Sequence, residues 1–125
     1  MSTKKIAVIT KNPSLQKQLS ESIEAYNFEV YLINSFPKAL TIITKEQVDI
    51  LLGDFSFNEP SRRAEFAEQL SEHSPQHASF IFFTDNDPDY FLIEDLKITQ
   101  TYYRIRKPVS SLELQHTINL VLDSA

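Results

Sequence analysis

The sequence predicts an α/β protein built on a doubly wound parallel sheet of five strands, flanked by five helices. Three observations support this prediction. Short apolar runs alternate five times with segments of helical periodicity. The connections between them are short, and the run 48–54 (VDILLGD) is apolar enough to be a strand buried on both faces, typical of the centre of a parallel sheet.

Length and composition limit the class of protein. The 125 residues fit one domain, 1–125, and the net charge of −5 argues against nucleic-acid binding by this domain. Cysteine is absent, which excludes disulfides and Cys-based metal sites. No apolar run approaches a membrane span, and no secretory signal precedes the first strand, so we expect a cytoplasmic protein without membrane contact.

The first half of the chain is expected to contain a strand, a helix, a strand, a helix and the central strand. Pro13 suits the first turn of the first helix, and Ser35 can cap the second. The expected ranges are 5–9, 13–26, 28–33, 36–43 and 48–54.

The second half repeats the alternation. Asp87 and Pro88 form an N-cap and first-turn pair, and Ser110 with Glu113 forms a capping box. The expected ranges are a helix over 61–73, a strand over 79–84, a helix over 87–96, a strand over 101–106 and a helix over 110–122. His73 and His77 flank a proline at the end of the helix 61–73 and are expected at the surface.

The ends of the strands carry the polar candidates. Right-handed crossovers leave few topologies for five such units, and we adopt the flavodoxin-like strand order 2-1-3-4-5. In such sheets function collects at the carboxyl ends of the strands, which here present Thr10–Lys11, Asp54, Thr84 and Lys107. Taken alone, Asp54 is also compatible with a residue that merely caps a turn.

Three motifs resemble the receiver domain of two-component response regulators, the CheY-like superfamily. They are DILLGD ending in Asp54, FIFFT ending in Thr84, and the pair Lys107–Pro108 before the last helix. The resemblance implies that Asp54 accepts a phosphoryl group from a histidine kinase, while Thr84 and Lys107 bind the phosphoryl oxygens. It also implies a cis Lys107–Pro108 peptide and a protein that is not an enzyme.

The chain departs from that family where the metal should bind. The resemblance implies an acidic pair after the first strand to hold Mg²⁺, but this chain has Thr10 and Lys11. Asp85 follows Thr84, where a small residue is usual, and its charge repels phosphate. We therefore expect an atypical receiver with Mg²⁺-dependent phosphorylation at Asp54 weak or lost and no resident cofactor. Lys11 either pairs with Asp54 or Asp85 in place of the metal, or extends into solvent beside a relic aspartate.

Two other functions stay open. The first is a phosphorylatable response regulator that recruits Mg²⁺ through Asp85 and the carbonyl group of Ser56. The second is a small flavodoxin-like enzyme or flavin carrier, which the loop 10–16 (TKNPSLQ) disfavours because it has no glycine to cradle a phosphate.

The resemblance also implies an interaction surface. The helix 87–96, the strand 101–106 and the helix 110–122 would form one face that includes Tyr103, Arg104 and Arg106. Mixed charge and aromatic side chains suit a polar protein interface, so this face is the expected contact for a histidine kinase or other signalling protein, or for a homodimer. The resemblance also implies that such a domain can form the N-terminal part of a longer regulator.

Overall fold

The computed structural model describes residues 3–54, 60–85 and 98–123, and for 60–64 it describes the backbone alone. Five parallel strands form one sheet in the order β2-β1-β3-β4-β5, which confirms the predicted topology. The strands are β1 (Lys5–Ile9), β2 (Glu29–Ile33), β3 (Ile50–Asp54), β4 (Ser79–Thr84) and β5 (Thr101–Arg106). The central strand is two residues shorter than predicted, because Val48 and Asp49 precede its ladder.

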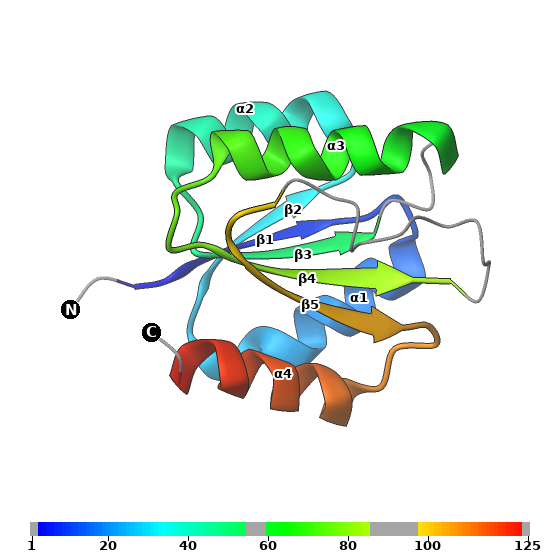
Figure 1. Ribbon diagram of the computed structural model, residues 1–125. Helices are drawn as coiled ribbons and strands as arrows, with labels where there is room; N and C mark the ends of the chain where they lie inside the picture. Colours follow the sequence, from blue (N-terminus) through cyan, green and yellow to red (C-terminus); the bar gives the residue numbers. More distant parts are fainter. Residues whose placement is uncertain (1–2, 55–59, 86–97, 124–125) are drawn as a thin grey trace.

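Helices cover both faces of the sheet (Figure 1). On one face lie α1 (Pro13–Ile23) and α4 (Ser111–Asp123), and on the other lie α2 (Phe36–Glu46) and α3 (Pro60–His73). A 3-10 turn, η1 (Glu24–Tyr26), follows α1. Within the described ranges there are thus four α-helices, and the further helix predicted over 87–96 lies outside those ranges.

The helix starts follow from local hydrogen bonding. The Asn12 side chain accepts from the backbone N–H groups of Ser14 and Leu15 at 2.9 and 3.1 Å, and so caps α1. Ser35 caps α2 by accepting from the Lys38 N–H at 3.3 Å. Ahead of α4, the Ser110 hydroxyl accepts from the Glu113 N–H at 3.4 Å, the part of the predicted capping box that holds the helix start.

The core consists of two apolar layers separated by the sheet. One layer lies under α1 and α4 and includes Ile6, Val8 and Leu52; the other lies under α2 and α3 and includes Leu51 and Phe82. Every residue of β3 is buried, as predicted for a strand covered on both faces. Because β3 lies between β1 and β4, its carboxyl end is adjacent to the carboxyl ends of both strands. No helix in the described part of the chain is long and apolar enough to cross a bilayer.

Candidate functional site

The predicted site residues meet at the carboxyl edge of the sheet. All five strands run in parallel, so their ends lie along the same side of the molecule, on the right in Figure 1. Asp54 ends β3, Thr84 ends β4, Thr10 follows β1 and Lys107 follows β5. The structure therefore brings together four side chains that the sequence places up to 97 positions apart.

Asp54 is the centre of this group, and its carboxylate is buried. The ammonium group of Lys107 lies 2.7 Å from Asp54 Oδ1, and the Thr10 hydroxyl donates to Asp54 Oδ2 at 2.7 Å. The Asp54 side chain is 1% exposed, so this ion pair is shielded from water on the carboxylate side. Both carboxylate oxygens are thus engaged by groups of the protein itself, one of them charged.

The Thr10 hydroxyl is held in a defined orientation. It accepts a hydrogen bond from the backbone N–H of Asn12 at 3.1 Å, which directs its own proton to Asp54. Asn12 in turn is fixed because its side chain caps α1. The loop between β1 and α1 therefore supplies a neutral donor to Asp54, a role for Thr10 that the sequence did not reveal.

Lys107 is positioned by both its backbone and its side chain. Its N–H donates to the Thr84 carbonyl at 2.8 Å, which continues the pairing of β5 with β4, and the Lys107–Pro108 peptide is cis as the resemblance implies. Its ammonium also lies 3.5 Å from Asp85 Oδ1. One cation therefore bridges the buried carboxylate of Asp54 and the more exposed carboxylate of Asp85.

The remaining candidates occupy the rim. Thr84 is buried at the end of β4, next to the strand that carries Asp54. Lys11 is exposed in the loop after β1, and its pairing with Asp54 or Asp85 stays a prediction. Ser56 lies outside the described residues. On β5, Arg104 and Arg106 are exposed and Tyr103 is partly buried against the core.

The donor set does not suit Mg²⁺. That ion requires several oxygen ligands in octahedral geometry and is usually held by carboxylates. At the end of β1, Thr10 offers a hydroxyl that already donates to Asp54, and Lys11 is a cation. In the part of the chain that the structure describes, no cluster of three or more acidic, histidine or cysteine side chains could hold a metal.

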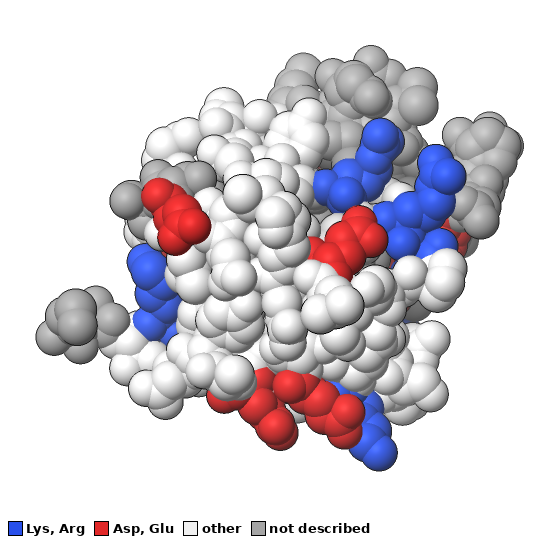
Figure 2. Space-filling view, turned by 90° about the horizontal axis from the view of Figure 1, so that it is seen from below, with Lys and Arg blue, Asp and Glu red and all other residues white. Residues whose placement is uncertain are grey.

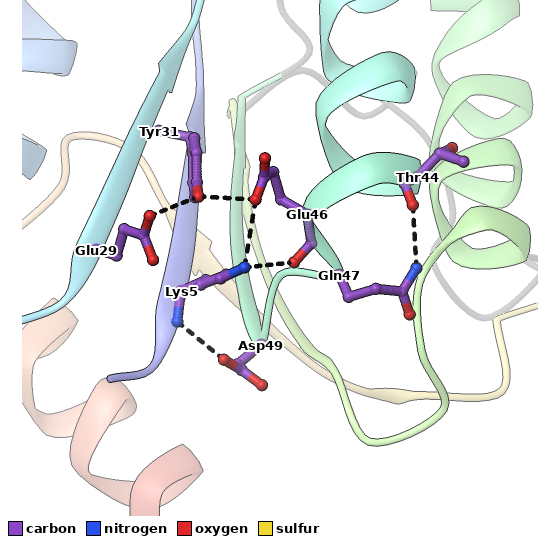
Figure 3. Close-up of polar contacts among 7 residues, drawn as sticks. All are labelled: Lys5, Glu29, Tyr31, Thr44, Glu46, Gln47 and Asp49. Atoms are coloured by element: carbon purple, nitrogen blue, oxygen red, sulfur yellow. Dashed lines mark hydrogen bonds and ion pairs between the residues drawn. The ribbon is translucent and has the colours of Figure 1, made fainter. Parts of the chain in front are cut away.

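A second polar network lies at the amino end of the sheet (Figure 3). Lys5 is its centre: its backbone N–H donates to Asp49 at 2.8 Å, and its ammonium contacts the Glu46 carbonyl at 3.1 Å and the Glu46 carboxylate at 3.3 Å. The Tyr31 hydroxyl lies 2.9 Å from a Glu29 oxygen and 3.2 Å from a Glu46 oxygen. The network joins β1, β2 and the end of α2.

This network shifts the titration of its members. Hydrogen bonds from Lys5 and Tyr31 hold the pKa of the Glu46 carboxyl below its ordinary value. Partial burial, together with the two neighbouring carboxylates, raises the pKa of Tyr31 well above its ordinary value. Burial raises the pKa of Asp49, but hydrogen bonds from the Lys5 N–H and from His77 outweigh it, so that the net shift is downward.

His77 contacts this end of the sheet. Its Nε2 lies 2.8 Å from Asp49 Oδ1, while the ring is largely exposed, in agreement with the prediction of a surface histidine. The amino-end network was not predicted, because its members come from separate elements and no local sequence pattern joins them.

Comparison with known proteins gives a likeness of fold. No protein-family model and no curated protein sequence matches the chain. A response regulator receiver protein from Sinorhizobium medicae has a similar structure, with a TM-score of 0.77, 15% identity, and coverage of 98% of this chain and 96% of that one. A response regulator from Thermotoga maritima matches with a TM-score of 0.74 and 15% identity over 98% and 99% of the two chains.

The structural similarity also includes a protein that is not named as a response regulator. An adenylate cyclase structure from Rhodopirellula baltica has a TM-score of 0.79 and 20% identity, covering 98% of this chain and 89% of that one. The chain therefore has the fold of CheY-like receiver domains, as predicted from three short motifs.

Proposed function

We propose that this chain is an atypical receiver domain of two-component signalling, which acts through protein–protein contacts rather than catalysis, with Mg²⁺-dependent phosphorylation at Asp54 weak or lost. One observation carries the proposal: both oxygens of the Asp54 carboxylate are already engaged by Thr10 and Lys107. These contacts lower the nucleophilicity of the carboxylate that would have to attack a phosphoryl group.

The charges around Asp54 support this proposal. Phosphoryl transfer to a carboxylate needs positive charge on the transferred oxygens, which a divalent ion usually supplies. Here Lys107 brings one positive charge, and Asp85, 3.5 Å away from it, offsets part of that charge. With Thr10 and Lys11 where metal-binding carboxylates would be needed, the site favours a fixed ion pair over a metal-dependent reaction.

A functional phosphoacceptor is the second candidate. It is favoured by the convergence of Asp54, Thr84 and Lys107 at one edge, which are the three residues that the resemblance assigns to phosphoryl acceptance and binding. In that case Mg²⁺ would have to be recruited by Asp85 and the carbonyl group of Ser56.

Intact-mass spectrometry after incubation with acetyl phosphate separates the two candidates. The wild-type protein and the Asp54→Asn control are compared with and without Mg²⁺. We expect no phosphoryl adduct on either protein. A Mg²⁺-dependent adduct on the wild type that is absent from Asp54→Asn would overturn the proposal in favour of the second candidate.

A gain-of-function variant tests the physical reason. Thr10→Asp combined with Lys11→Asp places two carboxylates at the end of β1 and removes both the hydroxyl donor and the nearby cation. We expect this variant to bind Mg²⁺ more tightly than the wild type in a calorimetric titration. Unchanged Mg²⁺ affinity in a folded variant would show that these two positions do not limit metal binding.

The partner-binding part of the proposal concerns the β5 face. Arg104 and Arg106 are exposed on β5, and Tyr102 is partly exposed beside them. Arginine and tyrosine are enriched at protein interfaces, so this face suits a histidine kinase or another signalling protein, or a second copy of the chain. Arg104→Glu should weaken capture of such a partner without changing the state of Asp54.

A further inference from the structure

The two edges of the sheet differ in how well they are protected. β2 and β5 are the edge strands, and an edge strand presents unpaired backbone groups to any other strand. β5 carries the exposed cations Arg104 and Arg106, a usual protection against edge-to-edge pairing. β2 instead exposes Val30, at 40%, and Leu32, at 52%.

These two apolar side chains lie on the same face of the sheet. Val30 is in register with Ile6 of β1, and Leu32 with Val8, both of which belong to the core layer under α1 and α4. The helices do not reach far enough to cover the edge strand. A shallow groove is left there, lined by the apolar residues Ile23, Phe28, Val30 and Leu32 and by the polar residues Ser20, Glu24 and Asn27. Figure 2 shows the face that α1 and α4 cover, where an uncharged surface is bordered by acidic side chains at its lower margin and by Lys and Arg side chains at its upper right.

At Val30 and Leu32 the backbone N–H and C=O groups of β2 point away from the sheet. The Glu29 N–H donates to the carbonyl of Lys4, which precedes β1, and the Ile33 carbonyl accepts from the N–H of Thr10, which follows β1. Glu29 and Ile33 therefore direct these backbone groups towards β1. Because backbone groups alternate along a strand, Val30 and Leu32 direct their N–H and C=O groups away from the sheet.

We infer that β2 pairs antiparallel with β2 of a second copy of this chain, about a two-fold axis at Tyr31, to form one continuous sheet. In this register Val30 lies opposite Leu32 of the second copy, and Leu32 opposite its Val30. Each of these two pairs exchanges both backbone hydrogen bonds, since all four residues face outward. The exposed apolar side chains of each copy cover those of the other, as an isologous interface requires.

The charges of the strand allow this arrangement. Glu29 is the only residue of β2 that is charged at neutral pH. In the proposed register the two Glu29 residues lie four positions apart along the strands, about 13 Å at the usual rise per residue. That distance exceeds the Debye length of roughly 8 Å at physiological salt, so their repulsion is screened. The same pairing of two β5 edges would bring arginines together.

The interface is small, so we expect a weak dimer that dissociates on dilution. It does not rest on the proposed chemistry of Asp54, and it leaves the β5 face free for a different partner. Sedimentation equilibrium of the wild type, Leu32→Lys, Leu112→Lys and Arg104→Glu tests it. Leu112 is a matched control because it is 79% exposed on α4 and does not line the groove beside β2.

We expect wild type, Leu112→Lys and Arg104→Glu to dimerise in the micromolar range, and Leu32→Lys to stay monomeric with an unchanged circular dichroism spectrum. A wild type that is monomeric up to about 1 mM would overturn the inference. So would a Leu32→Lys protein that dimerises like the wild type, and loss of the dimer in Arg104→Glu alone would assign it to the β5 face.

The register can be tested separately, because the chain has no cysteine. Tyr31 is the position that faces itself across the proposed axis, where Cα atoms of a non-hydrogen-bonded antiparallel pair lie about 4.5 Å apart. That spacing permits a disulfide. We expect Tyr31→Cys to form a covalent dimer on oxidation much faster than Leu112→Cys. Equal rates would contradict the register.

Discussion

Replacing Lys107 by methionine removes the cation that faces the buried carboxylate of Asp54. The two groups lie 2.7 Å apart, and their side chains are 21% and 1% exposed. Methionine keeps most of the aliphatic stem, so the change isolates the charge. The Thr10 hydroxyl would still donate to Asp54, but no charge of Lys107 would face the carboxylate.

The expected loss of stability is large for a single substitution. Breaking a buried ion pair by removing one partner costs about 3–5 kcal/mol, because the other charge stays buried and loses its counter-charge. The partial exposure of Lys107 places the expected value near the lower limit, about 3 kcal/mol. The contact with Asp85 adds little, at most about 1 kcal/mol, because that carboxylate is exposed.

Urea denaturation followed by circular dichroism measures this loss as a lower midpoint at unchanged slope. Combining Lys107→Met with Asp54→Asn completes a double-mutant cycle. We expect the two changes to be coupled by at least about 1 kcal/mol, since Lys107 has less to compensate once the carboxylate is neutral. Lys17→Met, at an exposed lysine of α1, is the control, with a smaller expected loss because Lys17 is exposed.

Two results would refute the reasoning. One is a Lys107→Met protein within about 0.5 kcal/mol of the wild type, the range of an ordinary surface substitution. The other is additivity of Lys107→Met and Asp54→Asn, which would mean that the pair does not interact in solution.

Three further predictions concern the rest of the fold. Glu46→Gln should reduce the loss of folding free energy at acid pH. The pKa of Glu46 is lowered in the folded state, so its carboxylate stabilises the fold above its ordinary pKa, and this stabilisation is lost as the pH falls through the folded-state pKa. Urea midpoints between pH 7 and 3 measure the difference between wild type and variant. In an ultraviolet titration Tyr31 should ionise above the ordinary range for tyrosine, and Tyr31→Phe should remove a late component of the curve; a curve whose late part is the same in wild type and Tyr31→Phe would contradict this. Gln100→Ala should cost about 1–3 kcal/mol in urea denaturation, because the buried Gln100 amide donates to the Ser71 carbonyl at 2.8 Å; Gln76→Ala, exposed nearby, is the control.

Much of the fold could be predicted because its signals are local. Apolar runs, proline positions and capping residues located the strands and four of the helices. The order of the strands came from the fold that this alternation resembles. Asp54, Thr84 and Lys107 were identified as a group because each ends or follows a strand, and parallel strands bring such positions to one edge.

The partner of Asp54 at the end of β1 could not be predicted in the same way. The sequence displays the charge of Lys11, but it does not display the direction of a hydroxyl group. Thr10 contacts Asp54 because Asn12 caps α1 and its backbone N–H orients the Thr10 hydroxyl. That arrangement depends on the geometry of three consecutive residues rather than on their charge.

The amino-end network and the exposed edge were missed for a related reason. Lys5 and Glu46 are 41 positions apart, and their contact depends on where α2 ends relative to β1. Val30 and Leu32 belong to an apolar strand, and the sequence does not state how far the helices extend over it. Exposure of these side chains follows from the width of the helical layer.

The central strand has carboxylates at both of its ends, and this arrangement bears on its alignment in the sheet. A strand that is apolar on both faces lacks the alternation that normally penalises a shift by one residue. In β3 such a shift would separate Asp49 from the Lys5 N–H and Asp54 from Lys107, or would draw one of these charges into the apolar interior. The two aspartates therefore fix the position of β3 along its neighbours, a task that its uniformly apolar interior cannot perform.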